Sequence, residues 1–273
     1  MIAPAAMFTI AFLAWPAVRA LGGAFETPAG AWTLDNFRAL VDDTDFALAT
    51  RNTLLLLAIV IPLEFVVALS LAVLAQSRLR GRRLLVSAWS FPLATSDLTA
   101  GLVWLAIFTQ HGYLNSALQQ LGWIRQPIGF LDYDNLLGLI VAVVLAESWR
   151  SISLVMVIFV SGLQSLPADV GEAAATLGAD AWRRFRHVTL PLLRPTIQVA
   201  LILRTTAALQ LFAVVLALTG NGVPVLATRT VSHMEAREYQ TAAAYAALLL
   251  VLSSLSTILY LAALRTPRHV FQP

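Results

Sequence analysis

The sequence contains no cysteine and no lysine, and only 12% of its residues are charged. Without cysteine, the chain can form no disulfide, thiolate nucleophile or thiolate metal site. Without lysine, it can form neither a Schiff base nor a Walker A loop, so any ATP that drives this protein must be bound by another subunit. Soluble domains carry about 25% charged residues, so this composition excludes an ordinary soluble protein.

The sequence instead contains long hydrophobic segments. Hydrophobic residues make up 59% of the chain, and the mean hydropathy is +0.77. Six windows are each long enough to cross a hydrocarbon core of about 30 Å as a helix. They are residues 2–21, 53–75, 84–108, 136–161, 197–219 and 242–264. The sequence therefore predicts an all-α, multi-pass membrane protein with about six spans, organised as a single transmembrane domain over residues 1–273.

The arginines lie in short loops and predict the orientation of the chain. Loops on one side hold ten Arg against three acidic residues, whereas loops on the other side carry a small net negative charge. The basic segments are residues 76–83, 162–196 and the tail from 265. By the positive-inside rule these segments and both termini are cytoplasmic. We interpret the Arg run at 78–83 as a topology anchor that also meets anionic lipid, and expect no nucleic-acid binding despite the pI near 9.8.

The first window begins at Met1 with no basic flank before it. It lacks the charged segment and the cleavage site of a signal peptide. We therefore expect a retained first span and a native start upstream of Met1.

The longest basic loop is too polar to span a bilayer and has the signals of two short helices. We expect a first helix just after Pro167, which Gly178 stops. Asp180 is placed to cap a second helix, and Pro191 and Pro195 are expected to end it. The loop therefore predicts a protruding cytoplasmic surface made of two helices with a glycine turn between them.

The same loop carries a spaced motif. Three residues separate Glu172-Ala173-Ala174 from Gly178, and nine more lead to Val188, Leu190 and Pro191. This pattern resembles the EAA loop of ABC importer permeases, E-A-A, three residues, G, nine residues, I-x-L-P, with Val in place of Ile. Other segments are similar to the binding-protein-dependent, carbohydrate-type permeases. They are LDNF at 34–37, GYLN at 112–115 and LTGNGVP at 218–224, and the last favours the MalF-like half over the MalG-like half.

The resemblance implies a fold, partners and a set of coupling residues. It implies the type I (MetI-like) importer fold in a bacterial or archaeal inner membrane. It also implies a MalG-like second permease subunit, two copies of an ATPase that bind ATP and Mg, and an extracytoplasmic solute-binding protein. The chain itself is expected to bind no cofactor and to catalyse no reaction. The residues expected to couple it to the ATPase are Glu172, Ala173, Ala174, Gly178, Asp180, Leu190 and Pro191.

Polar residues inside apolar spans are candidates for the cargo path, because such groups are costly in a bilayer. Glu147, Trp149 and Arg150 combine hydrogen-bonding groups with an aromatic plane, which suits a sugar. The other candidates are Gln210, Asn221 and Glu64. An interhelical ion pair is an equal alternative for Glu147 and Arg150, and a structural role is favoured for Glu64. We expect Arg204 to extend toward the cytoplasmic interface instead of facing cargo.

These observations predict the transmembrane subunit of an importer that moves a sugar or a related polar solute by alternating access. A polyol, a glycerol phosphate or phosphodiester, or a nucleoside is the alternative cargo. An intramembrane enzyme would need catalytic residues converging at one depth, and a channel would need self-assembly around a pore. The sequence has neither pattern, and its four His show no metal-ligand spacing.

Overall fold

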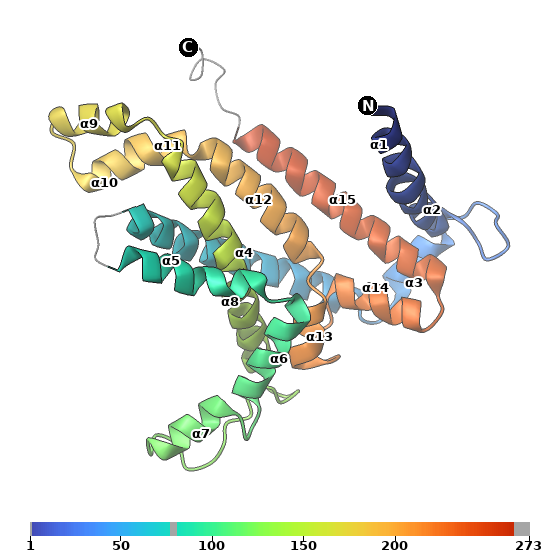
Figure 1. The fold of residues 1–273 in the computed structure, drawn as a ribbon. Helices are drawn as coiled ribbons and strands as arrows, with labels where there is room; N and C mark the ends of the chain where they lie inside the picture. Colours follow the sequence, from blue (N-terminus) through green and yellow to red (C-terminus); the bar gives the residue numbers. More distant parts are fainter. Residues whose placement is uncertain (1, 77–80, 265–273) are drawn as a thin grey trace.

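The computed structural model describes residues 2–76 and 81–264, which form helices and connecting loops (Figure 1). The Arg run predicted to anchor the topology lies partly outside these residues, at 77–80, as does the predicted cytoplasmic tail from 265. In chain order the helical elements are α1 Ile2–Thr9, η1 Ile10–Ala14, α2 Trp15–Gly22, η2 Gly23–Phe25, α3 Asp35–Asp42, α4 Phe46–Gln76, α5 Arg82–Ser90, η3 Phe91–Ala94, α6 Asp97–Phe108, α7 Tyr113–Gln120, α8 Leu136–Gln164, α9 Ala168–Thr176, α10 Ala181–Arg184, η4 Phe185–Thr189, α11 Leu190–Leu192, α12 Arg194–Leu209, α13 Ala213–Thr219, α14 Leu226–Glu235 and α15 Tyr239–Ala263.

Four helical segments of the described chain are long and apolar enough to cross a membrane, and two bent helix pairs raise the number to as many as six. The continuous segments are Ala6–Phe25, Phe46–Gln76, Leu136–Gln164 and Tyr239–Ala263. The predicted all-α fold with about six spans is therefore confirmed. A straight crossing at 84–108 is wrong, because Val86–Ala94 and Asp97–Gln120 meet at 110°. The window at 197–219 is also broken, by 46° between α12 and α13.

Local sequence explains the sharper bend. Pro92 lies in the first turn of the 3₁₀ segment η3, and Thr95 is extended. Ser96 then starts a new helix as its N-cap, since its hydroxyl accepts a hydrogen bond from the backbone N–H of Thr99 at 3.2 Å. A proline followed by an N-capping serine favours ending one helix and starting another. Hydropathy alone does not register this break, because both halves are apolar.

The packed centre of the molecule is built on α4 and α8, which lie against each other, with α6, α12 and α13 around them (Figure 1). Buried side chains from these helices form two hydrophobic clusters, and a third joins α3 and α15. Gly101 of α6 allows close packing on α13, since a Cβ there would lie 2.7 Å from the Ala217 Cβ. Two broken spans are thereby held against each other.

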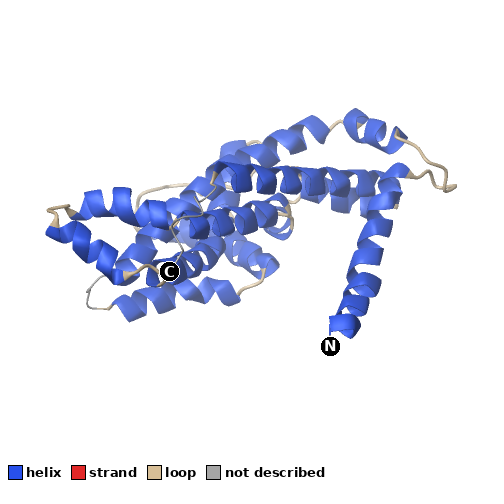
Figure 2. Cartoon of the chain, turned by 90° about the horizontal axis from the view of Figure 1, so that it is seen from above, coloured by secondary structure: helices blue, strands red, loops and turns tan. Residues whose placement is uncertain are grey.

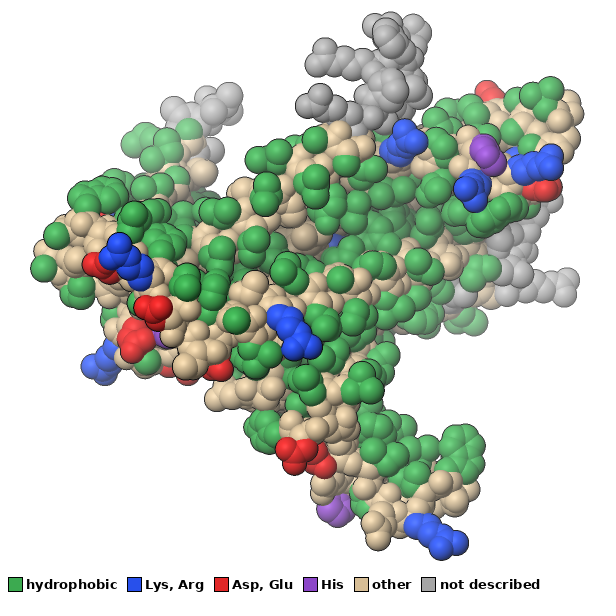
Figure 3. All heavy atoms as spheres, turned by 180° about the vertical axis from the view of Figure 1, so that it is seen from behind, with side chains coloured by type: hydrophobic (Ala, Val, Ile, Leu, Met, Phe, Trp, Pro, Cys, Tyr) green, Lys and Arg blue, Asp and Glu red, His purple; other side chains and the backbone are tan. Residues whose placement is uncertain are grey.

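The N-terminal helix leaves this centre and projects from it (Figure 2). Its apolar side chains are exposed, Phe12 by 67% and Trp15 by 64%. Hydrophobic side chains also cover much of the face in Figure 3, with the charged groups mainly toward its ends. Such a surface suits a chain surrounded by lipid and other apolar helices.

Candidate functional site

The EAA segment forms an exposed helix at the end of α8. Pro167 precedes α9, and Gly178 follows it with a φ of +83°, a conformation that glycine adopts without strain. Asp180 caps the next helix, because its Oδ1 accepts a hydrogen bond from the Arg183 backbone N–H at 2.7 Å. The expected helix, turn and cap all occur where the sequence places them.

The second helix of the loop does not end at its prolines, which corrects the sequence-based expectation. Residues Phe185–Thr189 form a π-helical turn between α10 and α11, and Pro191 lies inside a helical path that is continuous from Ala181 to Leu192. Pro195 follows the break at Leu193 and lies in the first turn of α12, where a helix accommodates proline because the N–H groups need no intrahelical acceptor. The helical path therefore runs from the loop into the fifth span with a break only at Leu193.

Most side chains of this loop face away from the protein. Glu172 and Ala173 are exposed, and Ala174 and Leu190 are half-buried. Leu177 is 88% exposed and Trp182 is 64% exposed, although Trp182 stacks on Phe185 with ring centroids 5.8 Å apart. Within the described chain the Glu172 carboxylate forms no ion pair. An apolar surface with an unpaired carboxylate is equipped to bind another protein.

The charged residues of the spans converge into one network. Arg204 of α12 donates two hydrogen bonds to Glu64 of α4, at 2.8 and 2.9 Å, and one to Glu147 of α8 at 2.9 Å. All three side chains are at most 1% exposed. The expectation that Arg204 extends to the membrane interface is therefore wrong. Burying the Arg204 guanidinium costs free energy, and its two ion pairs with carboxylates offset that cost. The same guanidinium at the membrane interface would lose both partners.

The network continues to the protein surface through α8 and α6. The Arg150 Nη2 lies 3.4 Å from Glu147 Oε1, and its Nε lies 3.0 Å from Asp97 Oδ1. Exposure rises along this path, from 1% for the Glu147 side chain to 21% for Arg150 and 53% for Asp97. Charges of alternating sign thus run from the helix bundle core to the N-terminus of α6.

Polar atoms without partners lie next to this network. The Glu147 Oε2 and the Ser148 Oγ are buried and have no hydrogen-bond partner within residues 2–76 and 81–264. Trp149 is half-buried, and its ring meets Trp104 edge-on with centroids 6.3 Å apart. Buried polar atoms are normally hydrogen-bonded, so these two acceptors have unused capacity for a polar ligand. Glu147, Trp149 and Arg150 share one region of α8, as the sequence suggests.

Gln210 and Asn221 lie apart from this region. Gln210 is exposed at the break that ends α12, and Asn221 is exposed in the turn after α13. In the described chain neither side chain hydrogen-bonds to the network. The structure therefore separates the six cargo-path candidates into a clustered group and two outlying residues.

A second ionic cluster, which the sequence analysis missed, joins the start of α4 to α14 and α15. Asp43 Oδ2 accepts hydrogen bonds from Arg229 at 2.7 and 3.1 Å and from the Tyr245 hydroxyl at 2.6 Å, and lies 3.0 Å from His233 Nε2. Burial by itself raises the pKa of Asp43, but the hydrogen bonds from Tyr245, His233 and Arg229 outweigh it, so the pKa lies well below its usual range. No short motif could reveal a cluster whose members are about 190 residues apart in the chain.

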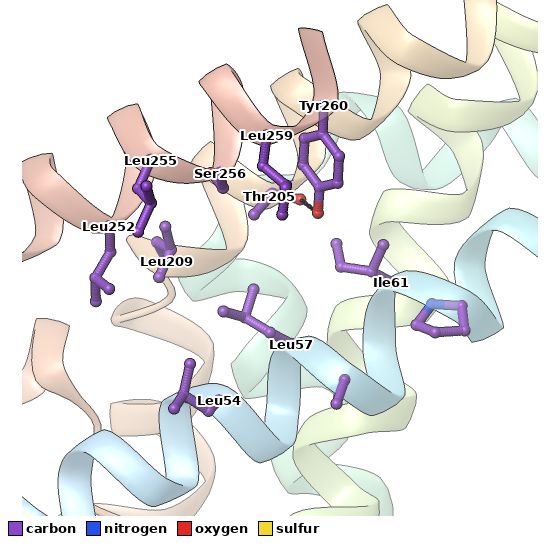
Figure 4. Close-up of a pocket in the computed structure, with 12 residues that line it drawn as sticks. Leu54, Leu57, Ile61, Thr205, Leu209, Leu252, Leu255, Ser256, Leu259 and Tyr260 are labelled. Atoms are coloured by element: carbon purple, nitrogen blue, oxygen red, sulfur yellow. Dashed lines mark hydrogen bonds between the residues drawn. The ribbon is translucent and has the colours of Figure 1, made fainter. Parts of the chain in front are cut away.

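An apolar groove of about 470 Å³ lies between α4, α12 and α15 (Figure 4). Leu57, Leu209 and Leu255 line it, and its polar groups include the Thr205 and Tyr260 hydroxyls, 3.0 Å apart. None of the described residues that line this groove is charged, and most of them are apolar. No group of His, Asp and Glu residues in the described ranges could hold a metal ion.

Comparisons with known proteins agree with these features. A family model for the binding-protein-dependent transport system inner membrane component matches residues 66–268. The trehalose/maltose transport permease of Thermococcus litoralis is 31% identical, over 84% of this chain and 78% of that protein. The sulfoquinovosyl glycerol transport permease of Agrobacterium fabrum is 32% identical over 97% and 89%. The sn-glycerol-3-phosphate transport permease of Brucella abortus is 33% identical over 85% and 80%.

Solved structures show the same fold. A bacterial ABC transporter for import of the acidic polysaccharide alginate has a TM-score of 0.82 at 19% identity, covering 100% of this chain and 95% of that one. The alginate transporter in complex with a pentasaccharide-bound periplasmic protein has a TM-score of 0.83 at 22% identity, covering 97% and 92%. The family match covers more than half of the chain, and the protein is therefore a member of the binding-protein-dependent ABC importer permeases, the multi-pass inner-membrane component of a transporter and not its catalytic subunit.

Proposed function

We propose that this chain is the MalF-like half of a heterodimeric permease that moves a sugar or a related neutral solute into the cytoplasm by alternating access. A MalG-like subunit forms the other half. Two copies of a partner ATPase bind ATP and Mg, and an extracytoplasmic binding protein delivers the solute. The observation that carries the proposal is the loop from α9 to α11, which carries the complete EAA spacing and exposes α9 on a surface with no partner in the described chain.

The loop can pass a movement of the ATPase to the membrane because it is built into two spans. It begins where α8 ends, and it leads through α10 and α11 into α12. α8 and α12 carry Glu147 and Arg204, which are joined by a hydrogen bond of 2.9 Å. A displacement of α9 would therefore reach the buried network through two helices that are tied to each other. Glu172 is the residue placed to pair with a cation of the ATPase.

The network favours a neutral cargo over an anionic one. The two arginines of the buried network already contact carboxylates: Arg204 contacts Glu64 and Glu147, and Arg150 contacts Glu147 and Asp97. A phosphate or sulfonate would need an unpaired cation. The unpartnered Glu147 Oε2 and Ser148 Oγ instead offer acceptors for hydroxyl donors, beside the indole ring of Trp149. A polyol carries hydroxyl donors as a sugar does, so the same acceptors suit both.

The alternative cargo is a glycerol phosphate, a phosphodiester or a nucleoside. Relatives named for glycerol phosphate and for sulfoquinovosyl glycerol are as similar to this chain as the relative named for trehalose and maltose. A phosphate cargo would require a cation from outside the buried network, supplied for example by the second permease subunit, whereas a nucleoside is neutral and would not.

The test is ATPase activity of the complex purified from the gene's own operon and reconstituted in lipid. Its binding protein is titrated after loading with sugars, polyols or glycerol phosphates in turn. We expect a sugar-loaded or polyol-loaded binding protein to stimulate hydrolysis, and Glu172→Lys to abolish uptake while the complex still assembles. Asp169→Asn, another charge change on α9 but outside the motif, is the matched control. Failure of any ATPase subunit to co-purify would contradict the proposal, and stimulation only by glycerol phosphates would support the alternative.

A further inference from the structure

A second pocket lies at the membrane boundary, away from the buried ionic network. It has a volume of about 600 Å³ and lies between the end of α4, the start of α5 and the end of α8. Gln76 and Gln164 end α4 and α8, and the Gln76 amide donates a hydrogen bond to the Val160 carbonyl at 3.3 Å. The pocket therefore lies at the end of α8 that leads into the EAA loop. The path of α8 into α9 can be followed in Figure 1.

The lining of this pocket is divided between polar and apolar groups. Ala75, Val86 and Val160 supply apolar surface. The polar groups are Arg82, Ser87, Gln76 and Gln164, and none of the described residues that line the pocket is acidic. In the described chain no side chain pairs with the Arg82 guanidinium. A pocket with one free cation, several hydrogen-bonding groups and apolar walls is suited to an amphiphile with an anionic head.

The start of α5 adds to the positive character. Arg82 is the first residue of this nine-residue helix, and the residue before it, Gly81, provides no capping side chain. The first backbone N–H groups of a helix are free to bind an anion, and the helix dipole favours negative charge there.

The position of the pocket along the bilayer normal favours a lipid headgroup over a soluble anion. α4 has 31 residues and α8 has 29, so both are about 45 Å long at 1.5 Å per residue. A bilayer with its headgroup layers is about 40–45 Å thick. The ends of these two helices therefore lie at the level of the headgroups, where phosphodiesters are abundant and soluble anions compete poorly with them.

We propose that this pocket binds the phosphodiester headgroup of an anionic phospholipid in the leaflet that faces the EAA loop. Arg82 and the N–H groups of α5 hold the phosphodiester, while Ser87 and the two glutamines hydrogen-bond to the headgroup. The acyl chains leave the pocket along its apolar side. The assignment of the leaflet as cytoplasmic rests on the proposed function, but the binding itself does not.

The test measures lipid retained by the full chain together with the subunits that co-purify with it. The protein is reconstituted in phosphatidylcholine vesicles containing phosphatidylglycerol, extracted, and analysed for bound phosphatidylglycerol by mass spectrometry. We expect Arg82→Gln to retain roughly fivefold less phosphatidylglycerol than wild type, the factor associated with one basic group near an anionic surface. Arg51→Gln, which removes an exposed charge from the other end of α4, is the matched control and should retain as much as wild type.

Two further variants test whether the charge of Arg82 is what retains the lipid. Arg82→Lys, which keeps the charge, should restore most of the retention, and Gln164→Glu, which neutralises the pocket without touching Arg82, should reduce it. Equal retention by wild type and Arg82→Gln, or an equal loss in Arg51→Gln, would overturn the proposal. Displacement of the lipid by millimolar inorganic phosphate would overturn it too, in favour of a soluble anion site. Because no cargo or nucleotide is used, this outcome is independent of the ATPase experiment.

Discussion

Arg204→Met is the perturbation that best tests the buried ionic network. Arg204 is 1% exposed, and it makes three hydrogen bonds to Glu64 and Glu147 at 2.8–2.9 Å. Methionine fills a similar volume but leaves two carboxylates buried without their shared cation. Removing one partner of a buried ion pair costs about 3–5 kcal/mol of the free energy of unfolding. On the scale of soluble domains, where about 1 kcal/mol shifts the melting temperature by 2–4 °C, the variant should melt roughly 6–20 °C below wild type.

The assay is thermal melting of the detergent-solubilised protein, followed by size-exclusion chromatography of the fraction that remains folded. Arg38→Met is the control, because Arg38 forms an ion pair that is exposed and therefore contributes at most about 1 kcal/mol. A double variant, Glu64→Gln with Arg204→Met, should melt above Arg204→Met alone, because it neutralises Glu64, the carboxylate that loses its cation, whereas Glu147 still has Arg150 at 3.4 Å. If Arg204→Met melts like the Arg38 control, or if the two changes of the double variant simply add, the reasoning is refuted.

Two further predictions concern the second ionic cluster, around Asp43, and the contact between α6 and α13. Asp43→Asn should cost about 2 kcal/mol of unfolding free energy, since it weakens hydrogen bonds between charged groups. The pKa of Asp43 is lowered in the folded state, so its contribution is complete above the unfolded pKa of about 3.9 and is lost as pH falls below it. Melting curves of wild type and variant should therefore stay separated from pH 8 to pH 5 and converge only in acid, and convergence near neutral pH would contradict this account. Gly101→Val should cost about 1–3 kcal/mol, because a Cβ there meets the Ala217 Cβ at 2.7 Å. Leu102→Val, at an exposed neighbouring position, should leave melting and uptake nearly unchanged, and equal effects of the two variants would count against close packing of α6 on α13.

The features that sequence alone predicted correctly depend on short stretches of chain. A bilayer requires about 20 apolar residues for each helical crossing, so the six windows indicate spans without any knowledge of packing. Helix caps and glycine turns act between residues three or four positions apart, which is why the start of α9, the turn at Gly178 and the cap at Asp180 follow from the sequence. The family motif belongs to this same local segment.

The features that only the tertiary structure decided depend on residues that are distant in the chain. The partners of Arg204 are 140 and 57 residues away, and sequence reasoning therefore assigned it a separate interfacial position. The bends in the third and fifth windows leave hydropathy unchanged, so their apolar composition could not reveal them. Sequence by itself determined that this chain crosses a membrane and presents an exposed loop of two short helices, because those properties follow from composition and local spacing. Only the tertiary structure decided which charges pair inside the membrane. A buried charge needs an opposite charge within contact distance, and that charge can lie far away in the chain.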